Sequence, residues 1–364
     1  MSHYDDTKKE YKKTVLNIGK VDGETWDPLT LYWKDEFNVK DMYDSLVEDG
    51  VDSSTGEQLG LNRLLDKGEY VIKYITSGAY PTFELLDASG KLYSKLSGIL
   101  IELAANRGDC TAIIDHTPNN QRPLVATSTS SVYYSVAEQG GFAKVNRVNS
   151  LGEDANTFAS MYTPYGIYET SMGDIMLPAS YGYLAAMSTQ AQSSNNWLAT
   201  AGVTRGQVPG LKALCQNVTN AMADSYQPRD GVAINAITNI KPYGLVIWGA
   251  RTLKDNAKKG DLTATSFMNI RQLTNDVKRQ VWVAAKTLTY EQNNDILWIK
   301  FKNKITPLLD NMINGNGISA YEIKRQSTTK KATVKAVVRL YAIEPVEDWD
   351  ITIELADSTT EILG

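Results

Sequence analysis

GLVIWGARTL, residues 244–253, holds an unbroken apolar run between two glycines, and an arginine follows almost at once. The run from Leu245 to Trp248 is typical of a buried strand. Arg251, placed directly after such a strand, could bind the carboxylate or phosphate of a ligand. No phosphate-binding glycines accompany it. We therefore expect Arg251 to bind a structural carboxylate or the carbonyl groups of a chain end.

Helical and strand patterns alternate on the N-terminal side of this stretch. Apolar residues at helical spacing between residues 92 and 103 precede TAIID (residues 111–115), which is typical of a short buried strand. GVAINAITNI (residues 231–240) is a further strand candidate. This alternation predicts an α/β protein with a mixed, partly parallel sheet.

The C-terminal third carries longer patterns. Apolar residues at helical spacing predict helices over residues 270–284 and 297–312, and a period of two predicts a strand over 334–342. Beyond Pro345 a second period-two run predicts a strand-forming arm, with the apolar positions Trp349, Ile351, Ile353 and Leu355.

These patterns divide the chain into four parts. We expect an N-terminal arm over residues 1–30, at the start of what could be a truncated chain, and an α/β domain with inserted loops over 31–235. A C-terminal core domain over 236–345 and a C-terminal arm over 346–364 follow. Lysines gather in the first arm and carboxylates in the second, so the two arms could attract each other between subunits.

Composition excludes several classes of protein. A net charge of -5 over 364 residues argues against a general nucleic-acid binder. No run of 18 apolar residues exists to span a membrane, and the polar first thirteen residues lack the apolar segment of a secretory signal. Two cysteines and two histidines are too few for a disulfide framework or a cysteine-based zinc site.

Motifs for catalysis are scarce. The sequence has no GxxxxGK[ST] loop, HExxH helix or GxSxG elbow. Asp115 and His116, at the end of the TAIID strand, could serve a hydrolase together with one of the serines at 128, 130 and 131. Adjacent residues on a strand point to opposite faces, so a polar strand end is the preferred interpretation. We predict no catalytic, cofactor-binding or metal-binding residue and expect no cofactor.

Several motifs, taken in order, resemble the C-terminal part of contractile phage tail sheath proteins. They include the "NAI" strand, the "WGARTL" strand, the "NIRQL" helix start and the "LW" helix. The matching residues are Asn235, Trp248, Gly249, Arg251, Asn269, Arg271 and Trp298. The resemblance covers residues 92–354. Gln272 departs from it, because a second arginine is usual there, and the Phe-Glu-Pro segment of the family is missing.

The resemblance implies an α/β sheath domain followed by a sheath core that ends in a strand-forming arm. It implies a structural subunit, not an enzyme, that forms stacked hexameric rings around a tail tube and contracts to drive the tube through the host envelope for genome ejection. Trp349, Ile351, Ile353 and Leu355 would then pair with a neighbouring subunit. Lys300, Lys302 and Lys304 are candidates for a tube-facing surface, and a solvated polar face is the alternative.

The expected partners are other copies of the chain, the tail tube protein, and the baseplate and tail terminator proteins, without nucleic acid or membrane insertion. The protein would be a late product of a myovirus, made in the host cytoplasm and carried in the virion. A hydrolase using Asp115 and His116, and a surface-lattice or adhesin protein, remain the alternatives.

Overall fold

The computed structural model describes most of the chain between Gln58 and Glu347. With backbone and side chains it describes residues 53–54, 56, 58–77, 96–115, 152–171, 173–192, 195–256 and 262–347. For the remaining elements it describes only the backbone of the strands β1 (Ser2–Asp5), β2 (Glu10–Lys13), β3 (Asn17–Val21), β4 (Thr25–Tyr32), β6 (Leu85–Leu86) and β7 (Leu92–Ser94). These six strands form three antiparallel pairs, β1–β2, β3–β4 and β6–β7.

A five-stranded sheet forms the centre of the molecule, in the order β14-β13-β9-β8-β5. The strands are β5 (Tyr74–Thr76), β8 (Thr111–Asp115), β9 (Ala159–Thr163), β13 (Asn235–Ile240) and β14 (Gly244–Trp248). The first four are parallel, and β14 joins the edge as an antiparallel strand. The predicted mixed α/β fold is confirmed.

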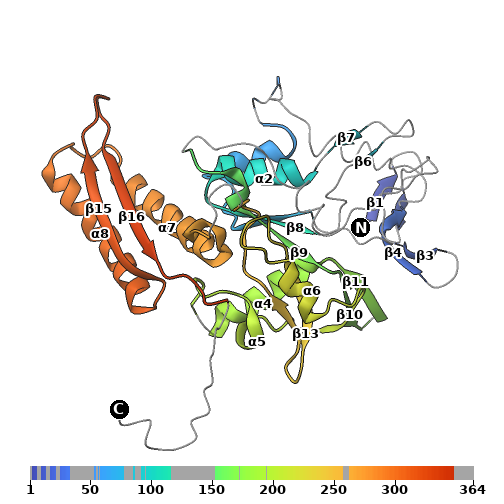
Figure 1. Ribbon diagram of the computed structural model, residues 1–364. Coiled ribbons are helices and arrows are strands. Elements are labelled where there is room, and N and C mark those ends of the chain that lie inside the picture. The colour runs from blue at the N-terminus through green and yellow to red at the C-terminus, as the bar shows by residue number, and fades with distance from the viewer. Residues whose placement is uncertain are drawn as a thin grey trace, which may run out of the picture.

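Helices cover both faces of this sheet (Figure 1). In β8, Ala112 and Ile114 pack with α2 (Leu96–Arg107), whereas Ile113 lies in the other core with α4 (Ala179–Ser193). Successive side chains of a strand point to opposite faces, so a strand buried on both sides is apolar throughout. TAIID is buried on both sides, and its three central residues are apolar. We call the sheet, with α2 and α4, the sheet body.

Smaller elements surround the sheet body. An antiparallel sheet, β11-β10-β12, consists of β10 (Gly166–Thr170), β11 (Gly173–Leu177) and β12 (Leu211–Leu214). The remaining helices of the body are η1 (Gly60–Leu65), η2 (Ala155–Phe158), α5 (Gly202–Arg205), α6 (Asn220–Ser225) and η3 (Ala264–Ser266).

A second, smaller core lies towards the C-terminus. It contains α8 (Asp295–Asn314) and a hairpin of β15 (Ile318–Gln326) and β16 (Lys335–Ala342), which together we call the C-terminal lobe (residues 295–342). Leu273 and Val277 of α7 (Met268–Lys286) pack with Leu309 and Met312 of α8. Met268, at the start of the same helix, lies in a core of the sheet body. Helix α7 therefore joins the body to the lobe (Figure 1).

Two expected element ends need correction, and the expected domain boundary is compared with the sheet below. Leu92 belongs to β7, and the helix begins only at Leu96. Residues 231–234 precede β13 instead of extending it. The expected domain boundary between residues 235 and 236 falls inside the central sheet, because β13 pairs with β9 and with β14. The change from one core to the next occurs within α7, where one helix serves both.

Candidate assembly site

Asn235 fixes the end of the central sheet to the loop that follows β14. Its Oδ1 accepts a hydrogen bond from the backbone nitrogen of Arg251 (2.8 Å), and its Nδ2 donates to the Arg251 carbonyl (2.9 Å) and to Ser160 Oγ (2.7 Å). Gly249 permits this close approach: its φ is +139°, and a Cβ there would lie 2.7 Å from Asn235 Oδ1. The backbone at Arg251 is thereby held in one place.

The side chain of Arg251 binds the C-terminal segment of the described chain. Its Nε donates to Glu347 Oε1 at 2.6 Å, and its Nη2 donates to Glu347 Oε2, so the contact is bidentate. The guanidinium also lies 5.4 Å from the centre of the Phe267 ring, and its side chain is only 3% exposed. The partner of Arg251 is thus a structural carboxylate. Glu347 lies just ahead of the period-two run of the arm.

Arg271 and Lys278 of α7 both bind Glu153. Arg271 donates to Thr157 Oγ1 (2.7 Å) and Glu153 Oε1 (3.4 Å), and its guanidinium lies 4.1 Å from the centre of the Phe158 ring. Lys278 Nζ donates to Glu153 Oε2 at 2.8 Å. Burial lowers the pKa of both cations, and the nearby Glu153 carboxylate opposes that shift. These contacts tie α7 to the sheet body.

Trp197 links the C-terminal end of α8 to the body. Its Nε1 donates to the Gly315 carbonyl (2.8 Å), while its own carbonyl accepts from Asn269 Nδ2 (3.1 Å). A Cβ at Gly315 would lie 2.3 Å from the indole ring, so only glycine fits beneath it. Asn269 therefore acts as a structural residue at the junction of body and lobe.

Two other motif residues also have structural surroundings. Trp248 donates from Nε1 to Asp224 Oδ1 (3.2 Å), and Trp298 stacks on Phe301 with ring centres 5.6 Å apart.

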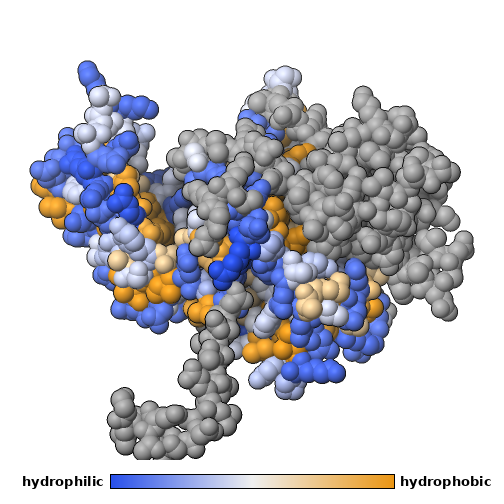
Figure 2. Space-filling view, viewed as in Figure 1, coloured by the Kyte–Doolittle hydropathy of each residue, from blue (hydrophilic) through white to orange (hydrophobic). Residues whose placement is uncertain are grey.

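The three lysines expected to face a tube lie on the surface of α8. Lys300 forms an exposed ion pair with Glu291 (2.9 Å). Lys302 and Lys304 are exposed. Residues 295–342 hold nine Lys or Arg and three Asp or Glu, in a chain whose net charge is -5. Hydrophilic residues cover most of this lobe in the view of Figure 2.

The hairpin of the lobe offers free strand edges. Within the described residues β15 pairs with β16 and with no other strand. An unpaired edge presents backbone N–H and C=O groups that a strand from another chain can bind. The arm residues Trp349, Ile351, Ile353 and Leu355 lie outside the described residues.

Asp115 serves as a cap for helix α4. Its Oδ1 accepts from the backbone nitrogen of Ser180 (2.7 Å), and its Oδ2 accepts from Ser180 Oγ (2.8 Å). Burial raises the pKa of this carboxyl to about 7, against the opposing effect of the Ser180 hydrogen bonds. His116 and the serines at 128, 130 and 131 lie outside the described residues. No group of His, Cys, Asp or Glu suited to a metal ion occurs in the part that the structure describes.

Sequence reasoning missed the partners of these residues. Glu347 lies 96 residues from Arg251, and Glu153 lies 118 residues from Arg271, so no local pattern links either pair. The several acidic residues beyond Pro345 indicated a possible partner for Arg251, but they did not single out Glu347. No helix in the described residues is long and apolar enough to cross a membrane.

Comparisons with known proteins found similarity in sequence and in fold. No family model matches the sequence. Over 144 residues, 39% of this chain, the sequence is 28% identical to the tail sheath protein of Vibrio phage KVP40, and the match spans 20% of that protein's length. The chain thus aligns with a fifth of the curated relative.

Solved structures share the fold over a longer part of the chain. A chain of the sheath complex of an extracellular contractile injection system (PVC), in its contracted state, gives a TM-score of 0.58 at 19% identity, covering 83% of this chain and 76% of that one. A chain of the anti-feeding prophage (AFP) baseplate gives 0.53 at 17% identity, covering 72% and 64%. The sequence relative and the shared fold together support a likeness to the contractile tail sheath family.

Proposed function

We propose that this protein is the structural subunit of a contractile phage tail sheath and that it works without catalysis. Copies would form stacked hexameric rings around a tail tube, and contraction would drive the tube through the host envelope for genome ejection. The protein would then reside in the virion of a myovirus, in contact with the tube, baseplate and tail terminator proteins.

One observation carries this proposal: an anchored chain end and an open hairpin occur in the same molecule. Arg251 holds the chain at Glu347, and an alternating run of residues follows directly. The β15–β16 hairpin has no other strand partner within the described residues. A run leaving one subunit from a fixed point can pair with such a hairpin on the next subunit through backbone hydrogen bonds.

Charge supports an orientation for the lobe. The excess of Lys and Arg over residues 295–342 contrasts with the acidic chain as a whole. A basic surface favours an acidic partner and steers its approach more than it adds affinity. We assign Lys300, Lys302 and Lys304 to a tube-facing surface on this basis.

Electron microscopy of the purified full chain at increasing concentration tests the proposal. Tubes with stacked rings support a sheath subunit. Flat sheets would instead favour a surface-lattice protein, and a chain that stays monomeric at every concentration contradicts both. Hydrolysis of a general esterase substrate that is lost in Asp115→Asn would favour the enzyme alternative.

A further inference from the structure

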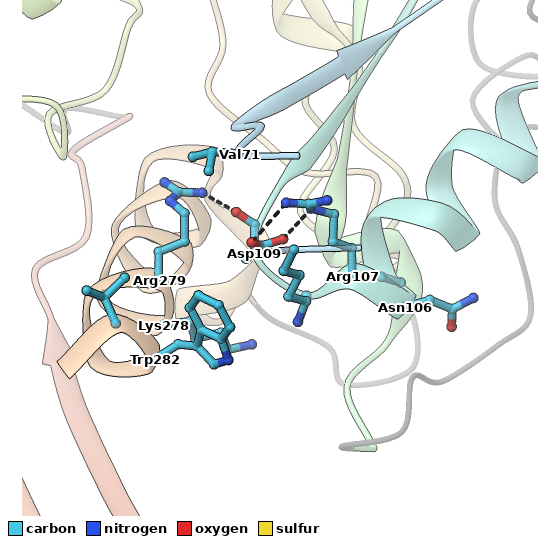
Figure 3. A pocket seen from close by; sticks show the side chains of 11 residues that line it. Val71, Asn106, Arg107, Asp109, Lys278, Arg279 and Trp282 are labelled. Atoms are coloured by element: carbon cyan, nitrogen blue, oxygen red, sulfur yellow. Dashed lines mark hydrogen bonds and ion pairs between the residues drawn. The ribbon is translucent and has the colours of Figure 1, made fainter. Parts of the chain in front are cut away.

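A hollow of about 380 Å³ lies between the sheet body and the second half of α7 (Figure 3). Its walls include Arg107 and Asp109 at the end of α2, Val71 beyond η1, and Trp282 and Val283 on α7. The proposed strand exchange at β15–β16 makes no use of it.

The apolar side chains of the hollow are unusually exposed. Val71 is 80% exposed, Val283 54% and Trp282 43%. Neighbouring apolar groups that stay in water forgo the stabilisation of burial, which is about 25 cal/mol per Å². Exposed aromatic residues beside a cavity are typical of the centres of protein interfaces.

Positive charge surrounds these apolar walls. Four cations and one carboxylate line the hollow: Lys67, Arg107, Lys278, Arg279 and Asp109. Arg107, Lys278 and Arg279 have internal partners in Asp109, Glu153 and Asp276. Lys67 forms no ion pair with any described residue.

Two further observations indicate an excess of positive charge around the hollow. Repulsion from Lys67 contributes to the lowered pKa of Lys278, after burial and Arg271. Lys286 lies 4.9 Å from the centre of the Trp282 ring. A carboxylate beside Lys67 would relieve the repulsion.

We infer that the hollow binds the start of the C-terminal arm of a second copy, with Trp349 between the apolar walls and its flanking aspartates beside the cations. Residues 348–364 contain five acidic residues and no Lys or Arg, and Trp349 stands between Asp348 and Asp350. A large aromatic ring flanked by carboxylates matches both features of the hollow. The inference rests on the proposed self-assembly and adds a second contact to it.

The geometry favours an arm that comes from another chain. Arg251 holds Glu347 beside Phe267, the residue before α7. Trp282 lies fifteen residues further along that helix, a distance of about 22 Å. The backbone from Glu347 to Trp349 spans at most about 7 Å. The helix from Phe267 to Trp282 is longer than this span, which favours the arm of a second copy as the occupant while the ion pair is intact.

Cross-linking between two full-length variants tests this inference. One variant carries Val71→Cys, and the other carries Asp350→Cys with a size tag, so that Trp349 stays intact. The native thiols react slowly, because burial raises the pKa of Cys110 to about 12 and that of Cys215 to about 11. A short bismaleimide should join the two variants. Replacing Val71→Cys by Ile299→Cys, at a 55% exposed position on α8, should abolish the product. Adding Lys67→Glu to the first variant should reduce it severalfold.

The outcomes separate this inference from the proposed function. Assembled tubes without the mixed product, or with equal product at Ile299→Cys, overturn the inference and leave the sheath subunit standing. A cross-link within a single chain that carries both Val71→Cys and Asp350→Cys also overturns it, because the occupant is then the chain's own arm. Absence of any assembly contradicts both.

Discussion

Glu347 and Arg251 lie 96 residues apart in the sequence, yet the carboxylate of one receives two hydrogen bonds from the guanidinium of the other. The arginine is almost fully buried, whereas the Glu347 side chain is 26% exposed. A buried cation without its carboxylate is strongly unfavourable. The pair therefore determines where the C-terminal segment leaves the sheet body. The distance that the arm can reach is set by its length from that point.

Substitution of Glu347→Gln should lower the free energy of unfolding by about 2 kcal/mol, because Arg251 loses a charged partner inside the protein. Urea unfolding followed by tryptophan fluorescence measures the change. Glu344→Gln is the matched control, since Glu344 is an exposed carboxylate three residues earlier and should have little effect. Equal stability of the two variants would contradict the assigned role of the pair.

Substitution of Gly249→Ala should destabilise the protein by about 3 kcal/mol or more, because it adds a clash with Asn235 and Gln227 to an unfavourable φ. Gly244→Ala, at the start of β14, is the control. Its φ is +89° with no atom within 4 Å of the added Cβ, so it should cost only about 1 kcal/mol. A thermal melt of both variants compares them, and a smaller loss at Gly249 would contradict the described packing.

Substitution of Asp115→Asn should change how stability depends on pH. The pKa of Asp115 in the folded protein is about 7, above its ordinary value of 3.8, so the folded state keeps a proton that the unfolded state releases between those values. Its contribution to stability is therefore present below about pH 4 and falls as pH rises to about 7, by up to about 4 kcal/mol. The asparagine variant lacks this loss.

Urea unfolding at about pH 5 and about pH 8 measures that difference. Relative to the wild type, Asp115→Asn should gain stability at the higher pH. The exposed control Asp230→Asn should show no such gain. A wild type and an Asp115→Asn variant with parallel pH profiles would show that this carboxyl ionises normally.

A chain that ends after Glu347 should fold with wild-type stability and fail to assemble into tubes. The truncation keeps the ion pair with Arg251 and removes only the proposed exchange strand. Sedimentation velocity and electron microscopy measure assembly, and urea unfolding serves as the control for folding. Tubes formed by the truncated chain would contradict the role of the arm.

Periodicity predicted the regular elements because local spacing determines which face of an element is buried. TAIID, the "GLVIW" strand and helices α7 and α8 were all found in this way, with ends within a few residues of those observed. The β15 strand was missed as a strand. Apolar and polar residues alternate over only part of this strand, and charged residues flank Ile323.

The contacts of the site could not be predicted to the same extent. Asn235, Gly249 and Arg251 stood out through a family motif, but a motif does not name the partners of its residues. The relation of the expected domain boundary to the central sheet could not be predicted, because β13 looks the same in sequence whether it opens a new domain or completes an existing sheet. Only the pairing of β13 with β9, 73 positions earlier at Tyr162, decides the matter.

Helix α7 has a mechanical consequence for the subunit. Its first turns lie in the core of the sheet body, Asn275 donates to the Cys110 carbonyl (3.0 Å), and Val277 packs in the lobe. One uninterrupted helix is stiff over this length, so a rotation of one end of α7 also rotates the other end. The lobe cannot swivel on the body unless this helix bends or unwinds, or loses its packing against α8. Any rearrangement between neighbouring copies that leaves it intact must turn each copy as one solid piece.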